Sequence, residues 1–139
     1  MNIINDSVQL STSGFSDMKN LTDKVSDKLN THKLQSGQVT LFVPGSTGGI
    51  TTIEYEPGLE KDFTELMEQI IPSNQRYHHD SRWGDNNGFS HLRASLIGPS
   101  LTVPFSDGKL MLGTWQQIVF IDFDNQSRSR SILLQFIGE

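Results

Sequence analysis

Residues 110–123, LMLGTWQQIVFIDF, form the longest stretch of the chain with the composition of a β-strand. Val119 and Ile121 lie on one face of this stretch, and Ile118 and Phe120 lie on the other. Successive side chains of a strand point to opposite faces of its sheet, so both faces here are apolar and must be covered. The stretch therefore predicts a long strand inside a sheet that other elements cover.

Five shorter segments also show the alternation of apolar and polar residues that is typical of strands. They are residues 2–12, 39–43, 50–55, 101–103 and 132–137. Most of them are joined by short turns, which favours antiparallel neighbours.

Two segments instead repeat apolar residues every three or four positions, as a helix does. The first is expected from Ser16 to Gln35, with a buried stripe of Met18, Leu21, Val25 and Leu29. The second is expected from Pro57 to Pro72, with a buried stripe of Leu59, Phe63, Leu66 and Ile70.

Residues 73–90 have no periodicity and are expected to form a long loop, and long ordered loops are usually functional. Residues 91–97 are ordered, but the pattern leaves open whether they form a helix or a strand. The order of elements predicts an α+β fold in which two helices pack on a large, mainly antiparallel sheet. The length of 139 residues suits a single domain over residues 1–139.

The composition limits the kinds of binding partner and of metal site that the protein can have. A net charge of −5 argues against nucleic acid or an anionic membrane surface as a partner. The chain has no cysteine, so a metal site would have to use His, Asp or Glu. No apolar stretch approaches the ~20 residues of a membrane helix, and no signal peptide is recognisable, so we expect a cytoplasmic protein.

The six residues 44–49, PGSTGG, predict a turn that can bind an anion. Its glycines would let the backbone approach a ligand, and successive amides in such a turn can surround a phosphate. Ser46, Thr47, Gly48 and Gly49 are therefore candidates for phosphate binding. The alternative is a plain hairpin turn between two strands.

The arginines give a second indication of phosphate, because all five lie after residue 75. Arg93 and Ser95 are two positions apart, as are Arg128 and Arg130. In an extended chain each pair would share a face, where arginine holds phosphate through paired hydrogen bonds. The alternative is a set of ion pairs with Asp122 or Asp124, which contributes little.

Three of the four histidines lie between residues 77 and 100. His78 and His79 are adjacent, and His91 follows after Asp85. Imidazole and carboxylate ligands suit a divalent ion such as zinc or magnesium. Because neighbouring side chains of an extended chain diverge, only one of His78 and His79 is expected at the site, and the sequence does not indicate which.

Aromatic residues with polar neighbours are candidates for lining a substrate. Thr114 and Gln116 flank Trp115, and together they could frame an organic ring. Trp83 offers a second aromatic surface for an electron-poor centre. The alternative for Trp115 is a place in the core.

Three blocks taken together resemble the YjbQ-type family, which is named for a secondary thiamine-phosphate synthase activity. They are VPGSTGGITTIEYEPGL, WGDNNGFSHLRASLIGPSLTVPF and GKLMLGTWQQIVFIDFDNQSRSR. The resemblance implies an α+β homotrimer with pockets near the subunit boundaries and a metal held by His91. Many relatives carry HTTAG where this chain has GSTGG, so Gly45 replaces a histidine. Many also carry a His-Glu-Gly-Asn run where Asp85 and Asn87 would have to substitute.

The resemblance implies a transferase that joins a pyrimidine-methyl diphosphate to a thiazole phosphate. His91, Asp85 and Glu54 are then the candidates for proton transfer or metal binding, and the metabolite is a small phosphorylated molecule. Two alternatives remain open at this point. One is a non-catalytic binder of a phosphorylated metabolite, and the other is a metal-dependent phosphate-ester hydrolase.

Overall fold

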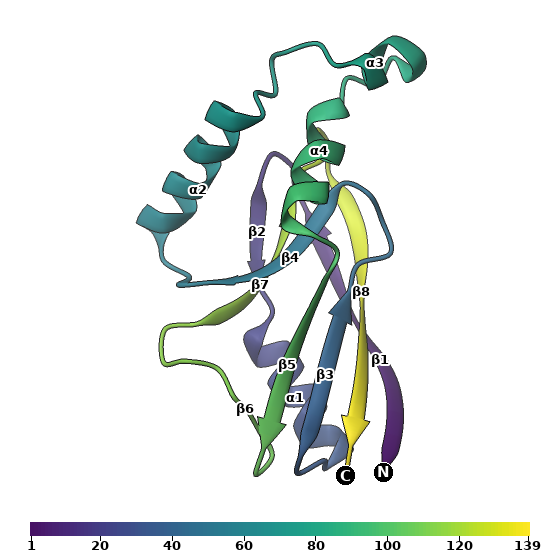
Figure 1. Cartoon of the computed structure of the whole chain (residues 1–139), viewed down its shortest axis with the longest axis vertical. Helices are drawn as coiled ribbons and strands as arrows, with labels where there is room; N and C mark the ends of the chain where they lie inside the picture. The colour runs from purple at the N-terminus through teal and green to yellow at the C-terminus, as the bar shows by residue number, and fades with distance from the viewer.

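Eight strands form two antiparallel sheets in the computed structural model, which describes residues 1–139 apart from the side chain of Trp83. The larger sheet has the strand order β1-β8-β3-β5-β6, and the smaller has the order β2-β7-β4 (Figure 1). The strands are β1 Asn2–Thr12, β2 Asp17–Asn20, β3 Gly37–Phe42, β4 Gly48–Ile53, β5 Ser100–Ser106, β6 Lys109–Leu110, β7 Gln117–Asp122 and β8 Arg128–Gly138.

Four helices accompany the strands. They are α1 Thr22–His32, α2 Pro57–Ile70, α3 His78–Trp83 and α4 Gly88–Ile97. Helix α1 lies behind the larger sheet, whereas α2, α3 and α4 gather at the opposite end of the molecule from the two chain termini (Figure 1). The expected α+β class, with helices packed on antiparallel sheet, is confirmed.

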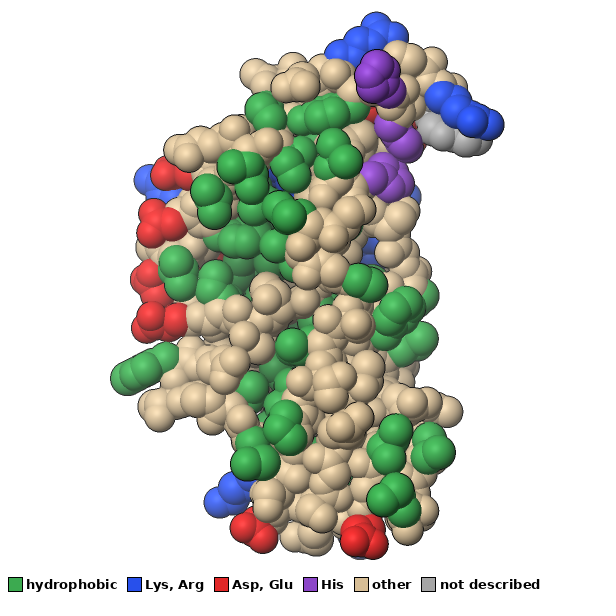
Figure 2. Space-filling view, in the orientation of Figure 1, with side chains coloured by type: hydrophobic (Ala, Val, Ile, Leu, Met, Phe, Trp, Pro, Cys, Tyr) green, Lys and Arg blue, Asp and Glu red, His purple; other side chains and the backbone are tan. Residues whose placement is uncertain are grey.

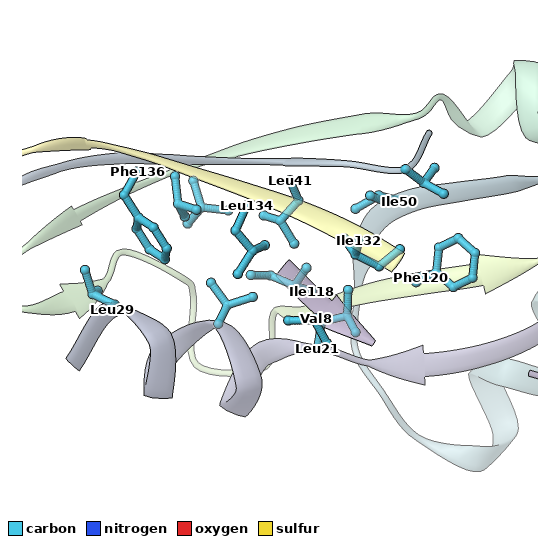
Figure 3. Close-up of a cluster of buried hydrophobic side chains, with 14 of the residues drawn as sticks. Val8, Leu21, Leu29, Leu41, Ile50, Ile118, Phe120, Ile132, Leu134 and Phe136 are labelled. Carbon is cyan, nitrogen blue, oxygen red and sulfur yellow. The ribbon is translucent and has the colours of Figure 1, made fainter. Parts of the chain in front are cut away.

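The main core lies between α1 and the larger sheet. Leu21, which precedes α1, and Val25 and Leu29 of the helix are at most 1 % exposed. Leu21 and Leu29 lie in the cluster between the helix and the larger sheet (Figure 3). Strands β1 and β8 pair over their full length, from Asn2 opposite Gly138 to Thr12 opposite Arg128. This register places the even-numbered residues of both strands on the core side, because the side-chain period of a strand is two.

Strand β7 separates two apolar clusters, as the apolar character of both its faces predicts. Ile118 and Phe120 join the main core, whereas Val119 and Ile121 pack in a second cluster with Phe123. All five side chains are fully buried. The second cluster also receives Met18 of β2, Met67 of α2 and Ala94 of α4.

Helix α2 begins where the sequence indicates and packs differently from the prediction. Glu56 caps its first turn by accepting hydrogen bonds from the backbone N–H groups of Gly58 and Leu59. The predicted buried stripe is partly wrong, because Leu66 and Ile70 are 48 % and 51 % exposed. The helix packs instead through Phe63 and Met67, which lie one turn apart.

Three boundaries differ from the sequence prediction. The first helix does not begin at Ser16, because residues 17–20 form β2. Residues 73–90 are not a single loop, since they contain α3. The stretch 110–123 is not one strand, because residues 111–116 leave the sheet between β6 and β7. In the part of the chain that the structure describes, no helix is long and apolar enough to cross a membrane.

Candidate functional site

Buried polar side chains gather where β7 ends, beside the first turn of α4 and the start of β8. They are Thr12, Thr47, Asn87, Ser90, Asp122 and Asp124, each no more than 7 % exposed. The two aspartates follow directly from the sequence, because the buried strand β7 ends in Asp122-Phe123-Asp124. A buried carboxylate is costly unless it is paired and hydrogen-bonded, so its partners define this region.

Asp122 is held by Arg130 of β8. Its carboxylate accepts hydrogen bonds from Nε of Arg130 at 2.8 Å and from Nη2 at 2.9 Å, a bidentate pair. Nη2 of Arg130 also donates to Oγ1 of Thr47 at 2.7 Å. A Cβ placed on Gly45 would lie 3.4 Å from Nη1 of Arg130. Arg130 therefore anchors the 44–49 turn to the end of β7.

Asp124 ties the same turn to helix α4. It accepts hydrogen bonds from Thr47 at 3.2 Å, from the side chain of Asn87 at 3.3 Å and from Nε of Arg128 at 2.9 Å. Burial acts to raise the pKa of Asp124, but the hydrogen bonds from the N–H of Asn125, from Asn87 and from Arg128 outweigh it, so the pKa lies below its ordinary value. Asp124 is therefore a carboxylate at neutral pH.

The first turn of α4 is fixed on β7 and so aims His91. Oγ of Ser90 donates to the carbonyl of Phe123 at 2.5 Å, next to the bond between Asn87 and Asp124. His91, the following residue, lines a pocket of about 180 Å³ together with Ser46, Ala94, Ser95 and others of the same two elements. The predicted residues Ser46, Ser95 and His91 are thus brought together.

His91 is neutral in this environment. Burial and the neighbouring His79 lower its pKa, whereas Asp124, Asp85 and a hydrogen bond to the backbone of Ser46 raise it by less. The net shift is downward. A neutral imidazole that uses one nitrogen for a backbone hydrogen bond keeps the other as a lone-pair donor.

Helix α3 brings a second histidine against His91. The rings of His79 and His91 lie 4.5 Å apart between centroids. Nδ1 of His79 lies 3.6 Å from a carboxylate oxygen of Asp80 and 3.6 Å from one of Asp85. His78 is exposed and lines a separate hollow with Arg76. His79 is therefore the member of the adjacent pair that faces the site.

Asp80 fastens α3 to α4. One of its oxygens accepts from the backbone N–H of Gly88 at 2.9 Å, and the other accepts from that of Tyr77 at 3.0 Å. The bond from Tyr77 lowers the pKa of Asp80, burial opposes this, and the bond from Gly88 lowers it further, leaving the pKa below its ordinary value. A Cβ on Gly88 would meet Cβ of Tyr77 at 2.7 Å, so only glycine admits this contact.

The donor set fits a divalent metal ion. One ligand atom from each of His79, Asp80 and Asp85 lies within 4.8 Å of the others. Nδ1 of His79 is buried and has no hydrogen-bond partner among the described residues, and neither has Oδ1 of Asn87. Buried polar atoms are rarely left without a partner. Nitrogen and oxygen donors of this kind suit zinc or a related divalent ion.

The predicted phosphate groups are arranged otherwise than the sequence indicates. Arg93 does not reach the pocket, because its side chain is only 1 % exposed. Its guanidinium donates hydrogen bonds to Glu68 at 2.7 Å and to the carbonyl of Ile71. Arg128 and Arg130 form the ion pairs with aspartate that were the alternative interpretation.

The glycine turn does not form the expected anion-binding nest. Gly48 and Gly49 are buried in β4, and neither has a positive φ. A Cβ on Gly48 would meet the ring of Phe120 at 2.5 Å, and one on Gly49 would meet Ile97 at 2.7 Å. Both glycines are therefore needed for packing, and Gly48 also lines the pocket together with Gly45 and Ser46.

Four further predicted residues lie away from this pocket. Glu54 is exposed just beyond the end of β4. Thr114, Trp115 and Gln116 lie on the exposed segment between β6 and β7, and Trp115 is 73 % exposed, so it is neither core nor pocket wall here. Gln116 bonds to Thr52 and lines a separate cavity of about 510 Å³ beside α1. The prediction for Trp83 falls outside the described side chains.

The sequence indicated Asp122 and Asp124 only as ion-pair partners of the arginines, and Asp80, although it stands beside the paired histidines, was not assigned to the site. The positions of Asp122 and Asp124 could have been predicted, because carboxylates directly after a fully apolar strand are buried at its end. Asp80 had a weaker signal, since it stands three residues after Tyr77, where an acidic side chain caps a short helix.

Comparisons with known proteins give a consistent family. Residues 6–139 match the family model described as "UPF0047 protein YjbQ-like". A UPF0047 protein of Methanothermobacter thermautotrophicus is 34 % identical over 139 residues, covering 100 % of this chain and 95 % of its own. One from Archaeoglobus fulgidus is 40 % identical over 99 residues, covering 71 % and 77 %.

Solved structures give the same fold. A protein of Sulfolobus solfataricus, described as YbjQ-like and of unknown function, superimposes with a TM-score of 0.93 at 28 % identity, covering 99 % of both chains. A Clostridium acetobutylicum protein of the yjbq/upf0047 family superimposes with a TM-score of 0.86 at 30 % identity, covering 95 % of this chain and 99 % of its own.

Proposed function

Because the chain belongs to the UPF0047 YjbQ-like family, for which a solved relative is described only as of unknown function, we propose a function from the chemistry of its own site. The chain is a divalent-metal-dependent enzyme that acts on a small phosphorylated metabolite. The observation that carries this proposal is the buried, unpartnered Nδ1 of His79, which faces two carboxylates and lies against His91.

The charges at the site favour a cation before an anion. Asp80, Asp85, Asp122 and Asp124 gather here, and the guanidinium groups of Arg128 and Arg130 are already paired with Asp124 and Asp122. A bare phosphate would meet this excess of negative charge. His79 and Asp85 of the clustered donors would hold the ion together with the adjacent His91, because both oxygens of Asp80 already accept backbone hydrogen bonds. The bound ion would supply positive charge for phosphate oxygens.

The leading reaction is transfer of the thiamine-phosphate type. The ring nitrogen of a thiazole phosphate donates its electron pair to the methylene carbon of a pyrimidine-methyl diphosphate. The bond from that carbon to oxygen breaks, and its electron pair leaves with the diphosphate. Fixed charges that meet the leaving group as its own charge develops lower the barrier. No proton has to move, so His91 serves as a neutral ligand and Ser46 and Ser95 offer hydroxyl groups to the substrate.

A second reaction is favoured by the size of the pocket. The volume of about 180 Å³ is smaller than the ~300–1,000 Å³ of typical sites for drug-sized ligands. A phosphate monoester with water as the second reactant needs less room than two heterocycles. The larger substrates would require walls from a neighbouring subunit, and we accordingly propose that the chain works as the homotrimer that the family resemblance implies.

Metal binding is tested with two adjacent histidines. Protein dialysed against chelator is titrated calorimetrically with ZnCl₂ and with MgCl₂. The wild type is expected to bind one ion per chain, and His79→Ala is expected to weaken binding at least about 10-fold. His78→Ala, which removes the exposed neighbour, is the matched control and should bind as the wild type does. Equal loss in both variants, or no binding by the wild type, contradicts the proposal.

The reaction is tested on the metal-loaded protein. His91→Ala should abolish product in an assay for thiamine phosphate and in rescue of a thiamine auxotroph. Release of inorganic phosphate from a simple ester, without coupling of two substrates, would identify the hydrolase instead. Binding of a phosphorylated ligand that survives His91→Ala, with no turnover in either assay, would identify a binding protein.

A further inference from the structure

A second cavity lies between α1 and the segment that runs from β6 to β7. Its volume of about 510 Å³ exceeds that of the pocket at His91 and falls within the ~300–1,000 Å³ that is usual for small-molecule sites. Figure 2 shows the purple histidines at one end of the molecule, whereas β6 lies toward the other end (Figure 1). The cavity is therefore separate from the candidate metal site.

One wall of the cavity is a polar stripe on α1. Thr22, Ser26 and Asn30 follow one another at intervals of four residues, so they lie on one face of the helix. This stripe runs beside Val25 and Leu29, which pack in the main core. None of the aspartates and lysines of α1 lines the cavity. A helix face that excludes the charges of its own helix is unexpected for surface that meets only water.

The hydroxyl of Ser26 is free to bind a ligand. Every other serine and threonine of the four helices makes a side-chain hydrogen bond, in three cases to the carbonyl four residues earlier. Ser26 makes none with the described residues, and neither do the side-chain amides of Asn30 and Gln35, which line the same cavity. Three neutral polar groups therefore border one cavity with their hydrogen-bonding capacity unused.

The opposite wall is held in place by hydrogen bonds. The side chain of Gln116 accepts from the N–H of Gly113 at 3.0 Å and donates to Thr52 of β4 at 3.1 Å. The N–H of Gly108, in the turn before β6, donates to the carbonyl of Gln35 at 3.0 Å. The walls are thus fixed before any ligand arrives, which lowers the entropy cost of binding.

The rest of the lining is part apolar and balanced in charge. Leu110 and Leu112 are half-buried against the main core and give the cavity an apolar side. Asp107 and Lys109 contribute one charge of each sign. Among the described residues that line the cavity there is no histidine and no aromatic side chain. Apolar surface with a few polar groups is typical of small-molecule sites.

We infer that this cavity binds a neutral carbohydrate of one or two rings. Hydroxyl and amide side chains both donate and accept hydrogen bonds, as each hydroxyl of a sugar does. The C–H face of a sugar ring would lie on Leu110 and Leu112. A phosphate would need an excess of Lys or Arg, a planar aromatic ligand would need a ring to stack on, and a metal ion would need clustered His or carboxylate ligands. The inference does not depend on the proposed metal chemistry.

Binding is tested by titrating the isotope-labelled full chain with maltose and with glucose while amide chemical shifts are recorded. The shifts should saturate and should centre on the cavity, including the amides of Ser26, Asn30 and Gly113. Asn30→Ala should raise the dissociation constant about 10-fold, because it removes one neutral hydrogen-bonding partner. Asn74→Ala removes an exposed asparagine outside the cavity lining and is the matched control, which should bind as the wild type does.

A second pair of variants fills the cavity. Ser26→Leu introduces a good helix former and should abolish binding. Thr31→Leu, at an exposed position of α1 outside the cavity lining, should not. Far-UV circular dichroism verifies that each variant is folded.

Three results overturn the inference. One is the absence of saturable binding by either sugar, and another is wild-type binding by Ser26→Leu. The third concerns glucuronate, the anionic counterpart of glucose, which should bind no more tightly than glucose; tighter binding, or shifts centred on His79 and His91, would show an anion site instead. Metal binding by His79 is measured separately and is unaffected by each of these results.

Discussion

The two ends of the molecule are stabilised by different interactions. At the end that holds α1, the buried core cluster consists of aliphatic and aromatic side chains from the helix, the larger sheet and the inner face of β7. At the end that holds α4, Asp122 and Asp124 are buried together with hydroxyl and amide groups and are paired with the partly buried Arg130. Both ends are close-packed, but only the α4 end depends on each buried charged group keeping its hydrogen-bond partner.

The difference indicates where function constrains the sequence. An apolar set of similar volume often stabilises a fold as well as a buried ion pair or better. The paired charges of the α4 end are therefore not required for folding as such. What they add is a fixed position for the 44–49 turn and for the first turn of α4, which carry Ser46 and His91.

Among the changes predicted at the two ends, removal of Arg130 should lower the free energy of unfolding most. Arg130→Met leaves Asp122 buried without its bidentate partner and is expected to lower the free energy of unfolding by about 3–5 kcal/mol. Denaturation in urea measures the loss. The double variant Arg130→Met with Asp122→Leu should recover part of it, because no charge then stays unpaired. A loss below about 1 kcal/mol in the single variant would mean that both ends are alike.

Truncation of a side chain in the apolar core should lower the free energy of unfolding by a similar or slightly smaller amount, through a different mechanism. Leu41 is fully buried, and Leu41→Ala should lower the free energy of unfolding by about 2–5 kcal/mol through the cavity it leaves. Unlike the loss in Arg130→Met, this loss should not be reduced by any second charge change. Leu66→Ala on the exposed side of α2 is the control, with an expected change within about 0.5 kcal/mol.

The smallest effect is expected at the ion pairs of Asp6 with Lys28 and His32, beside the apolar core. The N–H of Ser7 and the side chains of His32 and Lys28 lower the pKa of Asp6 to about 2 from 3.8. A lowered carboxyl pKa stabilises the fold fully above the ordinary value, and the contribution is lost as the pH falls through the folded-state value.

Asp6→Asn should therefore cost about 1 kcal/mol or less at pH 7. The difference from the wild type should shrink as the pH falls from 3.8 toward about 2. Thermal unfolding of both proteins across this range measures it, with Asp27→Asn, at an exposed aspartate of helix α1, for reference. A difference that stays constant with pH would mean that the Asp6 carboxylate contributes no charge-dependent stability.

The sequence predicted the α+β class because the apolar patterns of β1, β7 and β8 are long and regular. It placed the first helix too early because Met18 fits the helical spacing of Leu21, Val25 and Leu29, yet Met18 belongs to a strand that packs in the second cluster. Helix α3 has six residues, which is too few to show a period. The spacing of apolar residues indicates which face of an element is buried. It does not show where the element begins if the neighbouring element has apolar residues at the same spacing.

The site was predicted in part for a related reason. His91 and Ser46 meet because each lies beside a rigid element that the sequence reveals. The choice between His78 and His79 depends on the fold of residues 77–88, and the partners of Arg93 and Arg130 depend on tertiary contacts. One sequence lists the charged groups without pairing them, so Arg93 is equally consistent with a phosphate ligand and with the buried partner of Glu68 that it is.

Asp80 has a consequence for how this site can change over evolution. A single carboxylate holds both ends of a short excursion, at Tyr77 and at Gly88, and the segment between them contains a short helix and no strand. The excursion carries His79 and Asp85, so these metal-binding candidates can be replaced together by a change in one segment. A change in the length or sequence of this segment would exchange the groups offered to a metal, while the two sheets and the pocket wall at His91 keep their places.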